Sequence, residues 1–256
     1  MKIAVLQQNI IRNNPQENIT KTNVAIDDNA GFDLYVLPEM FNTGFGIKLQ
    51  APAQNKDDDA LCWMVKKAKE TNAAICGSVA VESNGGLYNR CYFVKPDGSI
   101  LHYDKHHLFS LGGEEAQYTA GNERVVVEYQ GWHIMLQICY DLRFPVFSRN
   151  RGDYDALVYV ANWPANRIDV WKTLLRARAL ENQCYVIGAN RVGSDTDCMY
   201  NGCSAIIDPY GNTLAEALDN KEQLITAEID FNTLQTFRKK FPVLEDRDDF
   251  ECKMNK

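Results

Sequence analysis

Long apolar runs are missing from this sequence of 256 residues. The opening run, Met-Lys-Ile-Ala-Val-Leu, turns polar at Gln7 and Gln8, and no later stretch is long enough to cross a bilayer. An apolar run this short is not typical of a signal peptide. We therefore expect a protein of the cytoplasm, where thiols stay reduced.

The sequence also lacks an excess of basic residues. Its 27 Lys and Arg are outnumbered by 34 Asp and Glu, which gives a net charge of -7. A nucleic-acid surface usually carries a basic stripe, and attraction to an anionic membrane needs clusters of Lys and Arg. Neither a nucleic acid nor a membrane is therefore expected as a partner.

Cysteine is not scarce, but its metal-binding patterns are absent. The eight cysteines include no CxxC pair and no Cys/His spacing of the kind that holds zinc. We expect no metal ion and no cofactor. Most of the thiols should be small apolar core residues.

No internal repeat or low-complexity linker divides the chain, so we expect a single domain over residues 1–256. Strand patterns alternate with helical ones, which include segments at 144–151 and 169–183. Hairpin turns are expected at 96–98 and 208–211. Hairpins mixed with helical crossovers, and roughly a dozen strands, favour two mixed sheets packed face to face with helices outside. This is a layered α/β architecture.

Cys139 is the first candidate for chemistry. In the stretch "LQICYDLRFP" (136–145) it ends an apolar strand, and the chain then turns at once to charged residues and proline. Ligands of α/β sheets tend to bind at the carboxyl ends of strands. Free cysteine is also among the residues most often buried. The residues alone therefore leave two interpretations open, a core thiol or a nucleophile.

A nucleophilic thiol needs a base, and histidine offers little here. Two of the four histidines lie in strand patterns, and the adjacent pair His106 and His107 fits no known Cys–His protease signature. A buried carboxylate can replace histidine, because loss of solvation favours its neutral form. Glu39, at the end of the strand pattern 33–40, fits this description. The alternative for Glu39 is a helix-start residue paired with an arginine.

Lys105 is a third candidate, since it follows the strand "ILHYD" and precedes the loop "HHLFSLGGEE". A lone lysine at a strand end is usually exposed. Glu114 and Glu115 lie in that loop, and spacing alone does not say which of them points inward.

Together, these residues belong to motifs that resemble the nitrilase superfamily of carbon–nitrogen hydrolases. The chain looks most like its omega-amidase branch, which hydrolyses the side-chain amide of 2-oxoglutaramate. The resemblance extends to about Phe250 and implies a four-layer α-β-β-α sandwich that forms a homodimer or larger homo-oligomer. The motifs that carry it are "LPEMFNTGF", "YDKHHLF", "ICYDLRFP" and "ARALENQCYVIGANRVG".

The resemblance implies a catalytic triad of Glu39 as base, Lys105 as cation and Cys139 as nucleophile. Lys105 and the backbone N–H of Tyr140 would form the oxyanion hole, and a thioester would form on the cysteine. Many relatives have Arg where His106 stands, which leaves the triad untouched.

Relatives often carry a second glutamate a few residues before a glycine that closes the loop after the lysine. Counting back from Gly121 favours Glu114 over Glu115.

Substrate contacts are expected from residues near these motifs. Arg143 and Arg191 are candidates for binding the substrate carboxylate, although Arg143 could instead pair with Asp141 as part of the scaffold. Trp163 could equally be plain core. The full set of expected contacts is Phe45, Tyr118, Arg143, Asn162, Trp163 and Arg191.

Other functions stay open from the sequence. The same triad would suit an N-carbamoyl amino acid hydrolase or a short aliphatic amide hydrolase. A redox sensor or binding protein with a reactive thiol would need Cys139 but neither Glu39 nor Lys105. Subunit contacts are expected from the segments 144–151 and 169–183 and from a C-terminal extension that begins at about residue 231.

Overall fold

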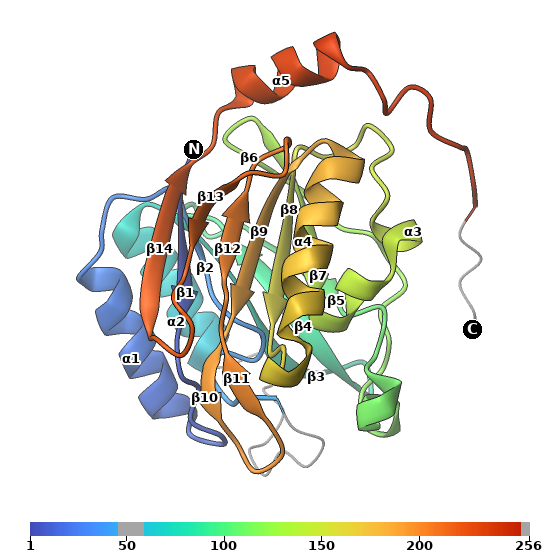
Figure 1. The fold of residues 1–256 in the computed structure, drawn as a ribbon. Coiled ribbons are helices and arrows are strands. Elements are labelled where there is room, and N and C mark those ends of the chain that lie inside the picture. Colours follow the sequence, from blue (N-terminus) through green and yellow to red (C-terminus); the bar gives the residue numbers. More distant parts are fainter. Residues whose placement is uncertain (46–58, 252–256) are drawn as a thin grey trace.

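The computed structural model describes residues 1–45 and 59–251, which fold as four layers in the order helix, sheet, sheet, helix (Figure 1). One sheet is covered by α1 (Pro15–Asp27) and α2 (Asp59–Thr71), and the other by α3 (Pro145–Ser148) and α4 (Ile168–Asn182). The expected α-β-β-α sandwich is confirmed. Within the described residues, none of the helices could cross a membrane, since none combines sufficient length with sufficient apolar character.

Each sheet has six strands among the described residues. The first has the order β14-β1-β2-β3-β4-β5, with β1–β2 and β2–β3 parallel. The second has the order β13-β12-β9-β8-β7-β6, with β7–β8 and β8–β9 parallel. The first comprises β1 (Lys2–Gln7), β2 (Leu34–Val36), β3 (Ala74–Ser83), β4 (Gly86–Val94), β5 (Ile100–Asp104) and β14 (Gln223–Glu228). The second comprises β6 (Val126–Tyr129), β7 (Trp132–Ile138), β8 (Ala156–Ala161), β9 (Tyr185–Asn190), β12 (Ala205–Ile207) and β13 (Thr213–Glu216).

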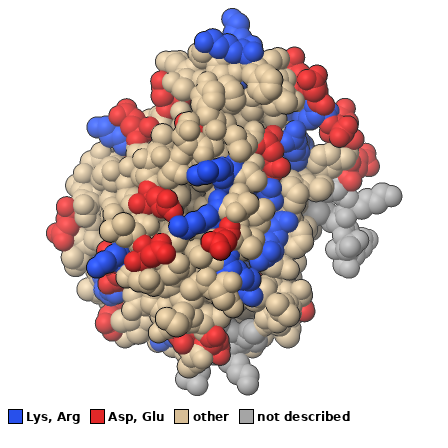
Figure 2. Space-filling view, viewed as in Figure 1, with Lys and Arg blue, Asp and Glu red and all other residues tan. Residues whose placement is uncertain are grey.

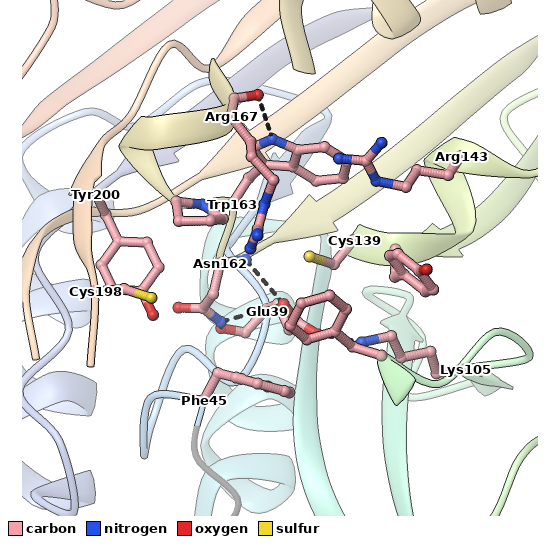
Figure 3. Close-up of a pocket in the computed structure, with 13 residues that line it drawn as sticks. Glu39, Phe45, Lys105, Cys139, Arg143, Asn162, Trp163, Arg167, Cys198 and Tyr200 are labelled. Atoms are coloured by element: carbon pink, nitrogen blue, oxygen red, sulfur yellow. Dashed lines mark hydrogen bonds and ion pairs between the residues drawn. The ribbon is translucent and has the colours of Figure 1, made fainter. Parts of the chain in front are cut away.

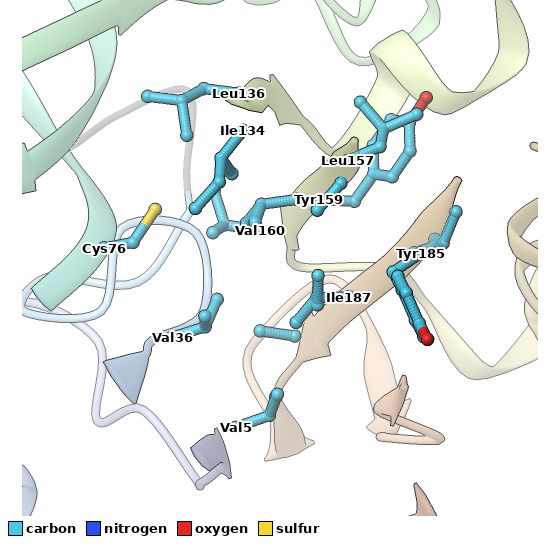
Figure 4. Packing of buried hydrophobic residues seen from close by; sticks show 14 of the residues in the cluster. Val5, Val36, Cys76, Ile134, Leu136, Leu157, Tyr159, Val160, Tyr185 and Ile187 are labelled. Carbon is cyan, nitrogen blue, oxygen red and sulfur yellow. The ribbon is translucent and has the colours of Figure 1, made fainter. Parts of the chain in front are cut away.

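The central strands are buried on both faces, and β1 illustrates why. Ile3 and Val5 belong to the core between the two sheets, whereas Ala4 and Leu6 belong to the core beneath α1 and α2. Successive side chains of a strand point to opposite faces, so an unbroken apolar run suits a strand covered on both sides. In Figure 4, Val5 and Val36 lie opposite side chains of the second sheet.

The predicted helix at 169–183 is present as α4. Trp171, Leu175 and Ala179 are spaced four residues apart and are all fully buried against the second sheet. Gln183 ends the helix in the left-handed conformation, with φ of +43°.

Two predicted elements are shorter than expected. The helix predicted at 144–151 spans only Pro145–Ser148, because Arg149 leaves helical geometry with ψ of 128°. The strand predicted over 33–40 ends at Val36. Pro38 has no N–H to donate to a neighbouring strand, which explains the early end.

Short elements surround the ends of these strands. A separate hairpin is formed by β10 (Val192–Ser194) and β11 (Met199–Asn201), and α5 (Phe231–Lys240) follows the last strand. The described residues also form four turns of 3-10 helix, namely η1 (Ser110–Gly112), η2 (Glu114–Ala116), η3 (Cys139–Arg143) and η4 (Ala165–Arg167).

Candidate active site

Cys139 is the first residue after β7 and the first residue of η3. Its φ of +45° lies in the left-handed region, which residues other than glycine rarely adopt. Strained backbone of this kind is typical of functional sites. The sharp turn presents the side chain to a pocket at the carboxyl end of the strand (Figure 3).

Glu39 reaches the same pocket from the first sheet, three residues after the end of β2. Its side chain is almost completely buried. Oε1 accepts a hydrogen bond from Nδ2 of Asn89 at 2.7 Å, and Oε2 accepts one from the backbone N–H of Asn162 at 2.8 Å. The alternative of a Glu–Arg pair is wrong, because the cation beside Glu39 is Lys105.

Lys105 follows β5 and is 1 % exposed, so the expectation for an isolated strand-end lysine does not apply to it. Its Nζ donates to Oε1 of Glu39 at 3.1 Å and to Oε2 of Glu114 at 2.9 Å. The ammonium group therefore lies between two buried carboxylates.

Glu114 is fully buried, whereas Glu115 is exposed. The loop that carries Glu114 is closed by Gly121, whose N–H donates to the carbonyl oxygen of Lys105 at 2.9 Å. A Cβ atom at Gly121 would lie 2.2 Å from the carbonyl oxygen of Asp104. Only glycine therefore allows the loop to pack this closely on the lysine backbone.

The charges of the cluster determine its protonation. Burial alone would lower the pKa of Lys105, but the charges of Glu114 and Glu39 outweigh burial and raise it, so Lys105 stays an ammonium ion. Burial, and after it the charge of Glu39, raises the pKa of the Cys139 thiol well above its usual range, while Lys105 acts in the opposite direction. Cys139 therefore rests as a neutral thiol.

The pocket around these groups is small, with a volume of about 70 Å³. A cavity this small suits a small molecule rather than a peptide or a nucleic acid. Aromatic rings and two arginines form much of its wall. The lining residues are Glu39, Phe45, Lys105, Phe109, Cys139, Tyr140, Arg143, Asn162, Trp163, Pro164, Arg167, Cys198 and Tyr200.

Four of the six expected substrate contacts line this pocket: Phe45, Arg143, Asn162 and Trp163. The guanidinium of Arg143 lies 5.0 Å from the centre of the Trp163 ring. The proposed scaffold pair of Arg143 with Asp141 is not present, because the Asp141 carboxylate accepts hydrogen bonds from other groups.

The other two expected contacts lie outside the pocket. Arg191 is fully buried, where Nη2 donates to the carbonyl oxygen of Ile10 at 2.6 Å and Nη1 lies 3.5 Å from Oδ2 of Asp195. Tyr118 packs against Met40, with its hydroxyl 3.8 Å from the sulfur. Both side chains are held by neighbours of the scaffold, which corrects the sequence-based expectation.

Sequence reasoning missed several lining residues. Arg167 shortly follows the strand end at "NWP" and could have been suspected from that position. Its carbonyl oxygen accepts a hydrogen bond from Trp163 Nε1 at 2.8 Å. Cys198 and Tyr200 reach the pocket on the hairpin β10–β11, which no motif marked. The described part of the chain contains no group of three or more His, Cys, Asp or Glu residues placed to hold a metal ion.

Comparisons with known proteins agree with this geometry. Omega-amidase YafV of Escherichia coli K12 is 45% identical over 251 residues, which are 98% of each chain. A 2-oxoglutaramate amidase of Bacillus subtilis is 39% identical over 250 residues, covering 95% of this chain and 96% of that protein. The crystal structure of XC1258 from Xanthomonas campestris, described as a CN-hydrolase superfamily protein with an arsenic adduct in the active site, has a TM-score of 0.96, is 40% identical and covers 99% of both chains.

Residues 2–239 match the family described as carbon-nitrogen hydrolase, so the match covers every strand of both sheets and the whole pocket. The family resemblance read from the four motifs is thus confirmed, and the chain belongs to the carbon-nitrogen hydrolase family.

Proposed function

We propose that this protein is an omega-amidase, which hydrolyses the terminal amide of 2-oxo dicarboxylic acid monoamides such as 2-oxoglutaramate and 2-oxosuccinamate to the 2-oxo acid and ammonia. The observation that carries the proposal is a strand-end cysteine that shares one pocket with a buried glutamate, a buried lysine and two arginines. Two relatives that match over nearly the whole chain are named for this activity.

The reaction begins with proton transfer, because Cys139 rests as a thiol. Glu39 accepts the Sγ proton while sulfur bonds to the amide carbon and the carbonyl electron pair moves onto oxygen. The ammonium of Lys105 and the backbone N–H of Tyr140 stabilise this oxyanion. Preorganised donors of this kind contribute about 3–4 kcal/mol each.

The tetrahedral intermediate then loses ammonia. Glu39 returns its proton to the nitrogen as the carbon–nitrogen bond breaks, which leaves a thioester on Cys139. Water, deprotonated by Glu39, attacks the thioester carbon, and the product carboxylate and the thiol are released. Glu114 holds Lys105 in place throughout, through the bonds from Nζ to its carboxylate.

The substrate carboxylate binds to Arg143 and Arg167. The guanidinium of Arg143 lies over the ring of Trp163, and that of Arg167 lies over the ring of Phe109. Within residues 1–45 and 59–251, no carboxylate forms an ion pair with either guanidinium. Figure 3 shows both arginines on one side of Cys139, with Glu39 and Lys105 on the other. A 2-oxo acid monoamide has a matching polarity, with an anion at one end and a neutral amide at the other.

The test is a panel of amides with ammonia detection. We expect 2-oxoglutaramate to be hydrolysed with a much higher kcat/KM than glutamine, asparagine, an N-carbamoyl amino acid or propionamide. Cys139→Ala should abolish the reaction and Cys139→Ser nearly so. Preference for glutamine, an N-carbamoyl compound or propionamide would replace the proposed substrate, and oxidant sensitivity without any ammonia release would favour a redox sensor.

The carboxylate site has its own variant. Arg167→Gln should raise KM for 2-oxoglutaramate by about tenfold or more, since a charged hydrogen bond is lost. Hydrolysis of propionamide, which has no carboxylate, should change little in the same variant. Equal losses for both substrates would show that Arg167 supports the pocket rather than binding the anion.

We also propose that the protein is a single-domain, cytoplasmic homodimer or larger homo-oligomer. The seven cysteines of the described chain are all free, which agrees with a reducing compartment.

Exposed apolar side chains on three segments support the proposed assembly. Val146 on α3 and Leu180 on α4 are about half exposed, and the extension from residue 231 begins with Phe231, which is 37% exposed. Figure 2 shows charges of both signs on the face that carries α4, which suits pairing with a second copy. Light scattering on wild type and Leu180→Asp checks this assembly.

A further inference from the structure

Asp141 lies two residues after Cys139 and is completely buried, yet it does not line the pocket. Its carboxylate accepts four hydrogen bonds. Oδ2 accepts from the backbone N–H of Ile138 at 2.9 Å and from the hydroxyl of Tyr103 at 2.8 Å. Oδ1 accepts from the backbone N–H of His107 at 2.9 Å and lies 2.8 Å from its Nδ1.

One of these bonds closes the turn that holds the nucleophile. The bond from Ile138 N–H spans Cys139, and the carbonyl oxygen of Asp141 accepts from the N–H of Phe144 at 3.0 Å. A residue held at positive φ costs about 1–3 kcal/mol and persists only where its surroundings impose it. The Asp141 carboxylate is part of what imposes it on Cys139.

The remaining bonds reach the segment that carries the lysine. Tyr103 and His107 lie on either side of Lys105 in the sequence, two residues away in each direction. The Tyr103 hydroxyl also accepts from the backbone N–H of His106 at 3.1 Å. Burial, and after it the charge of Asp141, raises the pKa of Tyr103. The hydroxyl therefore stays protonated and donates a hydrogen bond to Asp141.

We infer that Asp141, Tyr103 and His107 are positioning residues that fix the Lys105 segment of the first sheet to the Cys139 turn of the second. The inference rests on the proposed function. The two donors of the oxyanion hole, Lys105 Nζ and Tyr140 N–H, come from different sheets and must converge on one oxygen. A misplacement of about 1 Å in such a site can cost about 100-fold in rate.

Tyr103→Phe tests the inference, with Tyr35→Phe as a matched control. Both tyrosines are completely buried on strands of the first sheet, and each donates a hydroxyl hydrogen bond of 2.8 Å, Tyr35 to the carbonyl oxygen of Asn29. Both variants should lower Tm. Only Tyr103→Phe should lower kcat for 2-oxoglutaramate, by about tenfold with KM within about twofold of wild type.

Asp141→Asn should have the larger effect. One carboxylate oxygen is replaced by an NH₂ group, which cannot accept the hydrogen bonds that the donors around Asp141 now make. We expect kcat to fall about 100-fold. The kcat values are normalised to the folded fraction, measured by circular dichroism at the assay temperature, so loss of folding is not counted as loss of rate. If Asp141→Asn does not fold, the kcat of Tyr103→Phe alone tests the positioning role.

Normalised kcat of Tyr103→Phe equal to that of Tyr35→Phe would overturn the inference and leave the network a scaffold. A rise in KM with unchanged kcat would also overturn it, since positioning of the oxyanion hole acts on the transition state. Wild-type turnover of 2-oxoglutaramate is measured in the same series, so failure of the proposed function is distinguished from failure of the positioning role.

Discussion

Among the described residues, two buried lysines each contact two carboxylates, and one of the two lies in the pocket. Lys105 contacts Glu39 and Glu114. Lys67 on α2 contacts Asp27 and Glu70, both at 2.8 Å. The lysine side chains are 1% and 5% exposed, so burial of the cation does not separate the two clusters.

The two clusters differ in how far their carboxylates are exposed to solvent. Those beside Lys105 are 1% and 0% exposed, whereas those of Asp27 and Glu70 are 51% and 44% exposed. Burial opposes the charge of both lysines, and in both the neighbouring carboxylates outweigh it and raise the pKa. Asp27 and Glu70 stay hydrated if the lysine is lost, whereas Glu39 and Glu114 have almost no surface exposed to bulk solvent. The comparison indicates that a dry carboxylate pair, rather than a buried lysine, is what distinguishes the candidate site.

The largest contrast should be in turnover. Lys105→Met removes the cation of the oxyanion hole and should lower kcat by about 100- to 1,000-fold. Lys67→Met makes the same chemical change outside the pocket and should keep kcat and KM near wild type. Ammonia release from 2-oxoglutaramate measures both. Comparable losses in the two variants would mean that general stability, not the site, explains the effect.

The same pair of variants should differ in stability. Lys105→Met leaves two carboxylates in a dry environment, and removing one partner of a buried charge pair costs about 3–5 kcal/mol in the free energy of unfolding. Lys67→Met should cost less, because Asp27 and Glu70 remain hydrated. Urea unfolding measures the difference. Adding Glu114→Gln to Lys105→Met should restore part of the loss, and failure to do so would argue against an uncompensated charge.

A smaller contrast is expected between the glutamates. Glu114→Gln weakens two charge-assisted bonds to Lys105 and should lower kcat about 10- to 100-fold with KM changed less. Glu70→Gln, the matched change beside Lys67, should leave turnover unchanged. A kcat for Glu114→Gln close to wild type would show that Glu39 and the backbone suffice to hold the lysine.

Sequence patterns predicted the strand-end positions of Cys139 and Glu39, but they did not predict which polar side chains are buried. Cys139 and Glu39 each follow an apolar strand, and ligands of α/β sheets tend to bind at the carboxyl ends of strands. The two strands belong to different sheets, so their meeting depends on how the sheets pack. The strand-end position of Lys105 marked it as a candidate but did not predict its burial, because that burial depends on carboxylates from other segments of the chain. Arg191 and Tyr118 have suitable side chains but are bonded to the scaffold. Cys198 and Tyr200 depend on a hairpin placed by tertiary contacts, so no local pattern could reveal them.

The smallest expected effect concerns the thiol itself. Because burial and Glu39 raise the pKa of Cys139, little thiolate forms at pH 7, and iodoacetamide alkylation should still be accelerating above pH 8.5, where an ordinary thiol is half ionised. Lys105 lowers that pKa, so Lys105→Met should raise it further and slow alkylation at pH 8.5 several-fold, while Lys67→Met should not. Mass spectrometry of the Cys139 peptide follows the rate. A wild-type rate that is half-maximal near about pH 8.5 and constant by about pH 10 would mean that Cys139 ionises like an exposed thiol, and the buried carboxylate pair would then not control its reactivity.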